Sequence, residues 1–131
     1  MNVSLANSSL IASMVAEQRR ALIDKNYNEI YAHEMAHKRA AGSFAGDIVI
    51  ERNSEGIPVG GHVPIKMPTL NKENPQETID HANVVINSAM APDDPSEQDF
   101  KVANQARAIK QQAIEIKNNN PNLGKKLDIQ A

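Results

Sequence analysis

The chain has 131 residues, close to the commonest size of a single domain, and its 14 basic and 16 acidic side chains give a net charge of −2. This balance provides no positive field for nucleic acid or anionic lipid, and the lack of cysteine excludes disulfides, thiolate nucleophiles and sulfur-ligated zinc. The apolar stretch from Leu10 to Ala16 is too short to span a membrane, and no basic residue of a secretory signal precedes Arg19. We therefore expect a soluble, unprocessed protein, with a cytoplasmic location favoured.

The first predicted element is an amphipathic helix that Ser8 or Ser9 would cap. Its apolar positions recur with helical spacing and form a stripe that consists of Ile11, Met14, Val15 and Leu22. The polar residues 24–26 predict a break. A second helix is expected from Tyr27 to Gly42, because glycine tolerates the left-handed conformation of a helix C-cap.

From Asp47 the apolar residues alternate as they do in a strand. The turn sequence Asn-Ser-Glu-Gly at 53–56 separates this segment from a second apolar segment at 57–63, and the pattern predicts a β-hairpin. Gly60 and Gly61 in the returning strand indicate either a bulge or a close approach of the backbone to another element.

Two further helices are predicted in the C-terminal half, and similar signals start them. Asn74 is placed to cap the first, with Pro75 at its first position and Glu77 at its third, and the helix runs to about Met90. The sequence Asp-Pro-Ser-Glu at 94–97 repeats the signal for the second. That helix carries an apolar seam that requires a partner helix and comprises Val102, Ala106, Ile109, Ala113 and Ile116.

These elements predict an α+β fold that is mostly helical, with about four helices and one β-hairpin. Residues 1–117 are expected to form a single domain, and 118–131 a flexible polar tail that carries too little apolar surface to order itself. Because only 3% of the residues are aromatic, the core should be aliphatic and rich in alanine, which suits close helix packing.

The sequence His-Glu-x-x-His at 33–37 carries the chemistry. On a helix, residues four apart share a face, so His33 and His37 can direct their imidazole nitrogens at one metal ion, about 2.0 to 2.1 Å away for zinc. Glu34 points to the adjacent side, where it can accept a proton from a metal-bound water. The motif therefore predicts a zinc site with Glu34 as a general base.

A catalytic zinc site has a third protein ligand, and several residues compete for this position. We expect His62, because the two glycines before it let the backbone approach the metal-bearing helix. His81 lies opposite the apolar stripe of its own helix, which favours a solvated residue. The acids Glu77 and Asp80 could act as the downstream acidic ligand of a thermolysin-like site, although capping explains Glu77. Capping and helix-dipole roles are also assigned to Asp93, Asp94 and Asp99.

The motif and several flanking segments resemble the SprA-related family of bacterial metalloproteases over about 31–112. The segments are Ala32–Lys38, Ala41-Gly42, Ala45-Gly46, Val59–Val63, Thr78-Ile79, Ala91–Ser96 and Gln98-Asp99. The resemblance implies a minimal zincin-like fold and zinc-dependent hydrolysis of peptides. His62 is a departure, because the family usually has an acid after the two glycines.

Three functions remain open from the sequence. The first is a zinc metalloendopeptidase in which His33, His37 and His62 hold the ion and a peptide is the substrate. The strand at 47–52 would pair with that peptide, and Tyr31 or His81 would stabilise the oxyanion. The second is a catalytically silent, metal-stabilised module that binds a peptide or protein. The third is a helical domain that dimerises through the seam at 102–116.

Overall fold

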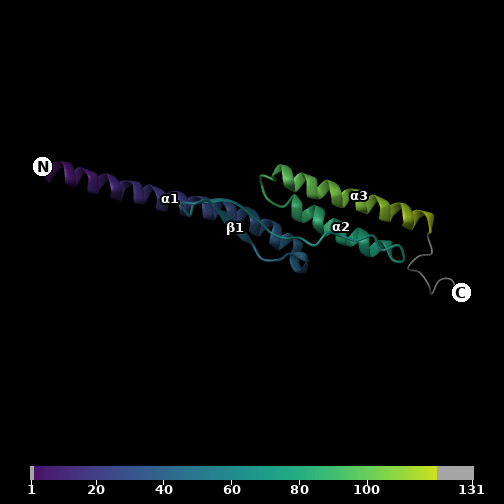
Figure 1. Cartoon of the computed structure of the whole chain (residues 1–131). Coiled ribbons are helices and arrows are strands. Elements are labelled where there is room, and N and C mark those ends of the chain that lie inside the picture. Colours follow the sequence, from purple (N-terminus) through teal and green to yellow (C-terminus); the bar gives the residue numbers. More distant parts are fainter. Residues whose placement is uncertain (1, 121–131) are drawn as a thin grey trace.

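The computed structural model describes residues 2–120 of the chain, and their side chains from residue 7 onward. The described elements are α1 (Asn2–Ala41), the short 3-10 helix η1 (Gly42–Phe44), β1 (Val49–Arg52), β2 (Pro58–His62), α2 (Pro75–Ala89) and α3 (Glu97–Asn119). The N-terminal half of α1 projects to one side and the α2–α3 pair to the other, so that the three helices overlap only in the middle (Figure 1). The expected mostly helical chain with one hairpin is confirmed, while the tail expected at 118–131 lies outside the described residues from 121 onward.

α1 is one continuous helix of 40 residues, so the prediction of a break at 24–26 is wrong, and the described part has three α-helices instead of about four. The segment contains neither glycine nor proline, and one asparagine costs a helix only about 0.5 kcal/mol. In addition, the side-chain amide of Asn26 donates a hydrogen bond to the carbonyl of Pro58, 2.9 Å away. Its polar group therefore stabilises tertiary structure instead of competing for the helix backbone. Because α1 already begins at Asn2, neither Ser8 nor Ser9 caps it.

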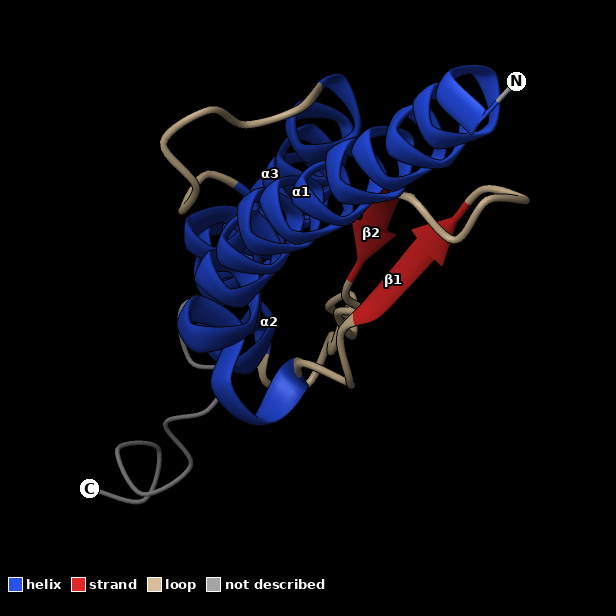
Figure 2. Cartoon of the chain, turned by 90° about the vertical axis from the view of Figure 1, so that its left-hand side faces the viewer, coloured by secondary structure: helices blue, strands red, loops and turns tan. Residues whose placement is uncertain are grey.

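The hairpin forms where it was predicted. β1 and β2 pair antiparallel, and the turn closes through Asn53, whose side chain accepts hydrogen bonds from the backbone N–H groups of Glu55 and Ile57. The register shifts between Glu51, which pairs with Gly60, and Arg52, which pairs with Pro58, so that Val59 is the extra residue. Gly61 makes the predicted close approach to α1. Figure 2 shows the hairpin lying to one side of α1, with α2 and α3 on its other side.

The two C-terminal helices form the best-packed part of the structure. Their contact is made by small side chains that are buried, namely Ala82, Val85 and Ala89 of α2 and Ala103, Ala106 and Ala113 of α3. Thus α2 is the partner that the seam of α3 required, and the alanine-rich core is confirmed. The first turns differ from the predictions. Asn74 precedes Pro75 but makes no side-chain cap bond, and α3 begins at Glu97 after the cap Ser96.

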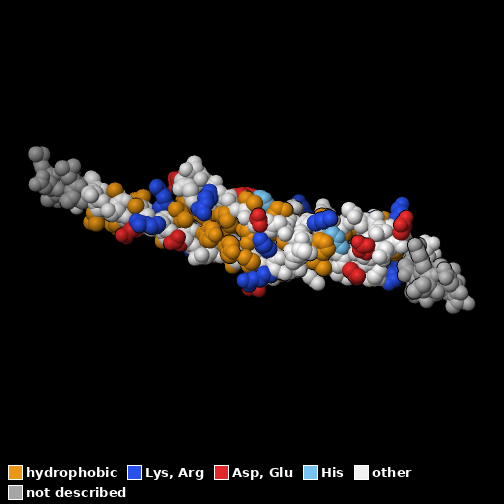
Figure 3. All heavy atoms as spheres, turned by 90° about the horizontal axis from the view of Figure 1, so that it is seen from below, with side chains coloured by type: hydrophobic (Ala, Val, Ile, Leu, Met, Phe, Trp, Pro, Cys, Tyr) orange, Lys and Arg blue, Asp and Glu red, His pale blue; other side chains and the backbone are white. Residues whose placement is uncertain are grey.

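The N-terminal half of α1 is exposed in the described structure. Its apolar side chains stand open to solvent, among them Leu10, Ile11, Met14, Val15 and Leu22. Figure 3 shows hydrophobic side chains along this end of the molecule, at the left of the view. None of the described helices has a stretch that is both long enough and apolar enough to traverse a lipid bilayer.

Candidate metal centre

The two histidines of the motif meet on the packed half of α1, as their spacing predicts. The Nε2 atom of His33 lies 3.2 Å from the Nε2 atom of His37. The side chain of His37 is buried, whereas that of His33 is partly exposed. Both imidazoles therefore present a nitrogen to one point between α1 and α3.

A carboxylate from α3 completes this arrangement. Oδ2 of Asp99 lies 3.1 Å from Nε2 of His33, and Oδ1 lies 3.1 Å from Nε2 of His37. Asp99 is also the third residue of α3 and closes a capping box with Ser96, as its assignment to a cap implies. Its backbone N–H donates to Oγ of Ser96, and its Oδ2 accepts from the Ser96 backbone N–H. The capping box thus holds the carboxylate against the histidines.

The spacing of these donor atoms is close to the requirement of a shared ion. Two ligands that each lie 2.0 to 2.2 Å from a tetrahedral zinc are about 3.3 to 3.6 Å apart. The three separations between His33, His37 and Asp99 are 3.2, 3.1 and 3.1 Å. Two imidazole nitrogens and one carboxylate form a donor set found in catalytic zinc sites. The residues present therefore fit a metal ion.

Hydrogen bonds behind His37 fix the orientation of its ring. Nδ1 lies 2.7 Å from the backbone carbonyl of Ser88, which can only accept, so Nδ1 carries a proton. In the neutral ring the lone pair is then on Nε2, the nitrogen that faces His33 and Asp99. The hydroxyl of Ser88 in turn donates to the carbonyl of His37, also at 2.7 Å. A ligating histidine commonly donates its second N–H in this way, because the bond fixes the tautomer and raises the basicity of the ring.

Glu34 lies beside the cluster that His33, His37 and Asp99 form. Its carboxylate offers an oxygen within 4.8 Å of both ligand nitrogens, and with His33 and His37 it forms a group that could hold a metal ion. Among the described residues, however, none forms a hydrogen bond or ion pair with it. Burial raises the pKa of the Glu34 carboxyl above its ordinary value, and the nearby charges of His37 and His33 lower it by less. Glu34 thus lies within reach of any ion that the two histidines hold.

Gly61 of β2 leaves room for the side chain of Glu34. A Cβ atom on Gly61 would lie 2.7 Å from Cγ2 of Ile30 and 3.2 Å from Cγ of Glu34. No larger residue could be placed there without moving the strand away from α1. The close approach that the glycines predicted is therefore made against the helix that carries the motif.

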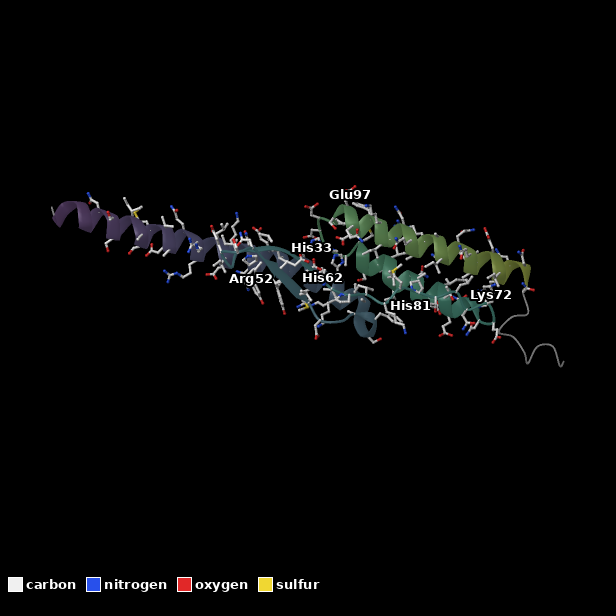
Figure 4. The ribbon with its side chains drawn as sticks, in the orientation of Figure 1. His33, Arg52, His62, Lys72, His81 and Glu97 are labelled. Atoms are coloured by element: carbon white, nitrogen blue, oxygen red, sulfur yellow. The ribbon has the colours of Figure 1, made fainter. Side chains whose placement is uncertain are left out.

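The structure does not bring His62 into the cluster. Its exposed ring donates from Nδ1 to Oε1 of Glu51, 3.1 Å away on the neighbouring strand. Figure 4 shows His62 and His33 near the overlap of the helices, and His81 well removed from both. The ring of His81 stacks on Phe44 and bonds to the carbonyl of Lys66.

The other candidates also lie elsewhere. Glu77 and Asp80 pair with Asn71 and Gln76, respectively, near the start of α2. Glu77 is eleven residues before Ser88, which corresponds to about 16 Å along a helix. Tyr31 is exposed and stacks on Tyr27.

The model of the SprA-related family matches residues 8–119. The chain belongs to this family. Comparisons with curated proteins and with solved structures found no match. The SprA-related match spans all of the residues that form the cluster, from the histidines of α1 to the aspartate of α3.

The structure places Asp99 beside both histidines, a position that its predicted capping role does not indicate. A usable signal was present. The dipeptide Gln98-Asp99 is one of the segments on which the SprA-related resemblance rests, and an acid from a downstream helix was the expected alternative to a third histidine. Glu77 and Asp80 lie on α2, whereas the acid that faces the histidines comes from α3.

A pocket of about 300 Å³ opens beside the cluster. Glu34, His37 and Asp99 lie on one part of its wall, and Gly61 and His62 on another. Most of the remaining wall is aliphatic and consists of Val63, Ile65, Met67, Val85, Ala89 and Val102. An extended molecule in this pocket would therefore lie against both the candidate metal ligands and a hydrophobic surface.

Proposed function

We propose that this member of the SprA-related family is a zinc-dependent metallopeptidase, in which His33, His37 and Asp99 hold the ion. The observation that carries the proposal is the convergence of two imidazole nitrogens and one carboxylate at about 3.1 Å, beside an unpaired Glu34 and an open pocket. Asp99 replaces His62 as the third ligand in this proposal. The packing of the motif helix against one hairpin and a downstream helix is then a minimal zincin-like unit.

Zinc is the proposed ion because the histidines and the glutamate occur in a His-Glu-x-x-His helix. When bound, zinc would lower the pKa of a coordinated water toward about 7 and polarise the scissile carbonyl. The two histidines and the aspartate would supply three protein ligands, the number typical of a catalytic zinc site. The alternative, a catalytically silent module, requires the same ligands but no turnover.

Glu34 would transfer the protons of the reaction. The carboxylate takes a proton from the attacking water as the water oxygen bonds to the carbonyl carbon, and the carbonyl π electrons move to its oxygen. Glu34 then delivers that proton to the amide nitrogen, and the C–N bond breaks. The second water proton also ends on the amine, so peptide and water yield a carboxylate and an ammonium group.

The proposed reaction is tested by Glu34→Gln, which keeps the size of the side chain but removes the proton acceptor. We expect the variant to bind one zinc per chain and to lose at least a thousandfold in cleavage of an unfolded protein substrate, measured by mass spectrometry of the products. Equal cleavage by the variant would refute the mechanism. A zinc-loaded native protein that cleaves nothing would support the silent module.

The ligand set is tested separately by metal content. We expect Asp99→Asn to lower the affinity for zinc by at least a hundredfold, and His62→Ala to leave one zinc per chain. His81→Ala is the matched control, since its ring lies on Phe44 away from the cluster. Loss of zinc in His62→Ala with retention in Asp99→Asn would restore the original ligand prediction.

A further inference from the structure

We propose that the pocket beside the cluster binds an extended peptide as a strand added to the free edge of residues 61–65, with an aliphatic side chain of that peptide inserted between the hairpin and the helices. This inference rests on the proposed function and names the substrate class of the same site. It moves the expected strand addition from 47–52 to the end of β2 and the extended segment that follows it.

The hydrogen bonds of the hairpin show which edge is free. Beyond β2 the backbone continues to pair with the segment that precedes β1, because Gly46 N–H donates to the carbonyl of Pro64 and Lys66 N–H donates to that of Phe44. These bonds direct the polar groups of residues 64 and 66 toward that segment. In an extended chain, the backbone N–H and C=O groups of the neighbouring residues, here 63 and 65, point to the opposite edge.

Val63 and Ile65 provide the backbone groups of this free edge. Among the described residues, none forms a hydrogen bond with their backbone N–H or C=O groups, and both residues line the pocket. Unpaired backbone groups at a strand edge recognise an extended peptide through its main chain. The edge lies opposite α2 and α3 across the pocket, so an added strand would pass the cluster on α1.

The side-chain preference follows from the wall of the pocket. Val63, Ile65 and Met67 face it from the hairpin side, and Val85, Ala89 and Val102 from the helices. The lining also has four uncharged polar residues, namely Ser88, Ser96, Gln98 and Gln105, and its titratable groups are Glu34, His37, His62 and Asp99. An aliphatic side chain placed against the six apolar residues would bury apolar surface, whereas an acidic or basic one would lose its hydration there.

The preference is tested with zinc-loaded Glu34→Gln protein, which does not turn over in the proposed mechanism. The probes are fluorescein-labelled peptides of the form Ala-Ala-X-Ala-Ala with X as leucine, alanine, aspartate or lysine, and binding is measured by anisotropy. We expect the leucine peptide to bind at least tenfold more tightly than the other three. Equal binding of the leucine and aspartate peptides would overturn the proposed preference.

A filled pocket provides the second test. Val102→Phe should weaken binding of the leucine peptide at least tenfold and that of the alanine peptide by less than threefold. Ala108→Phe, which adds the same ring at an exposed position of α3, is the matched control and should leave both affinities unchanged. Equal losses for both peptides, or none, would contradict insertion of a side chain at this wall.

The proposed hydrogen bonds between the main chain of the peptide and the strand edge are tested with modified peptides. N-methylation of single amides in the leucine peptide should weaken binding at least tenfold at every second position, because only alternate amides face the strand edge. Loss at consecutive positions, or at none, would overturn the added strand. If selective binding is found but the native protein cleaves no peptide, the proposed function fails and this inference stands. If the native protein cleaves peptides but shows no preference for leucine, the proposed function stands and this inference fails.

Discussion

The two halves of α1 belong to one helix but have opposite surroundings. Residues 7–22 expose their apolar stripe to solvent, with Leu10 and Ile11 each 60% accessible. Residues 26–41 lie against β2 and α2, and bury Glu34 at 7% and His37 at 6% accessibility. The half with the clearer apolar stripe is therefore the exposed one, and the half with the polar motif is the buried one.

This contrast shows what makes the motif a candidate site. Two histidines four residues apart would share a face anywhere on a helix, as the apolar residues do in the first half. Only the second half has a partner that supplies Ser88 behind one ring and Asp99 in front of both. Burial also leaves Glu34 without water on most of its surface, which raises its pKa.

The largest effect is expected from substitution of His37, the buried histidine of the proposed metal site. His37→Ala should abolish binding of zinc and destabilise the metal-free protein by about 1 to 3 kcal/mol, because the carbonyl of Ser88 loses its side-chain donor. Metal analysis and urea unfolding followed by circular dichroism measure the two effects. Retention of a full equivalent of zinc would show that the packed half of α1 is not the metal centre.

A smaller effect is expected from the contact between the hairpin and the packed half. Gly61→Ala should destabilise the fold by about 1 to 3 kcal/mol, because the new Cβ overlaps Ile30 and presses on Glu34. Gly60→Ala is its matched control, since a Cβ there meets only the flexible end of Glu51 at 3.4 Å. Equal unfolding free energies for the two variants would mean that β2 does not lie against α1 as closely as the structure shows.

The capping box should contribute about as much as an ordinary helix cap. Ser96→Ala removes the hydroxyl that accepts from Asp99 N–H, and we expect a loss of about 1 kcal/mol in the free energy of unfolding. Ser96→Thr keeps the hydroxyl and should recover most of this loss. If the zinc affinity also falls in Ser96→Ala but not in Ser96→Thr, the cap is needed to orient the carboxylate.

The smallest effect is expected in the exposed half. Met14→Gln and Leu10→Gln should change the free energy of unfolding by no more than about 0.5 kcal/mol, because neither side chain is buried. The zinc content should stay the same in both. A loss above about 1.5 kcal/mol, or a concentration-dependent unfolding midpoint, would show that another surface covers this half in solution.

Much of the local structure could be predicted because it depends on neighbours in sequence. Asn53 and Gly56 specify the hairpin turn, Gly42 ends the first helix, and Pro75 starts α2. The predicted break at 24–26 is wrong because the segment has no glycine or proline to end a helix, and because the amide of Asn26 bonds to Pro58, thirty-two residues away. Nothing in the polar composition of that segment indicates such a partner.

By itself, the sequence determined that the chain is mostly helical with one hairpin, and that two imidazoles and a carboxylate share one helix. These features follow from backbone periodicity and from the fixed spacing of residues along a helix. Only the tertiary structure decided which residue faces the histidines. His62 follows the glycines that let β2 approach α1, yet its ring lies against Glu51, while Asp99 reaches the cluster because α2 and α3 pack through alanines. The packing of whole helices and strands decides which side chains lie near a candidate ion, and the type of a residue does not by itself specify where its side chain lies.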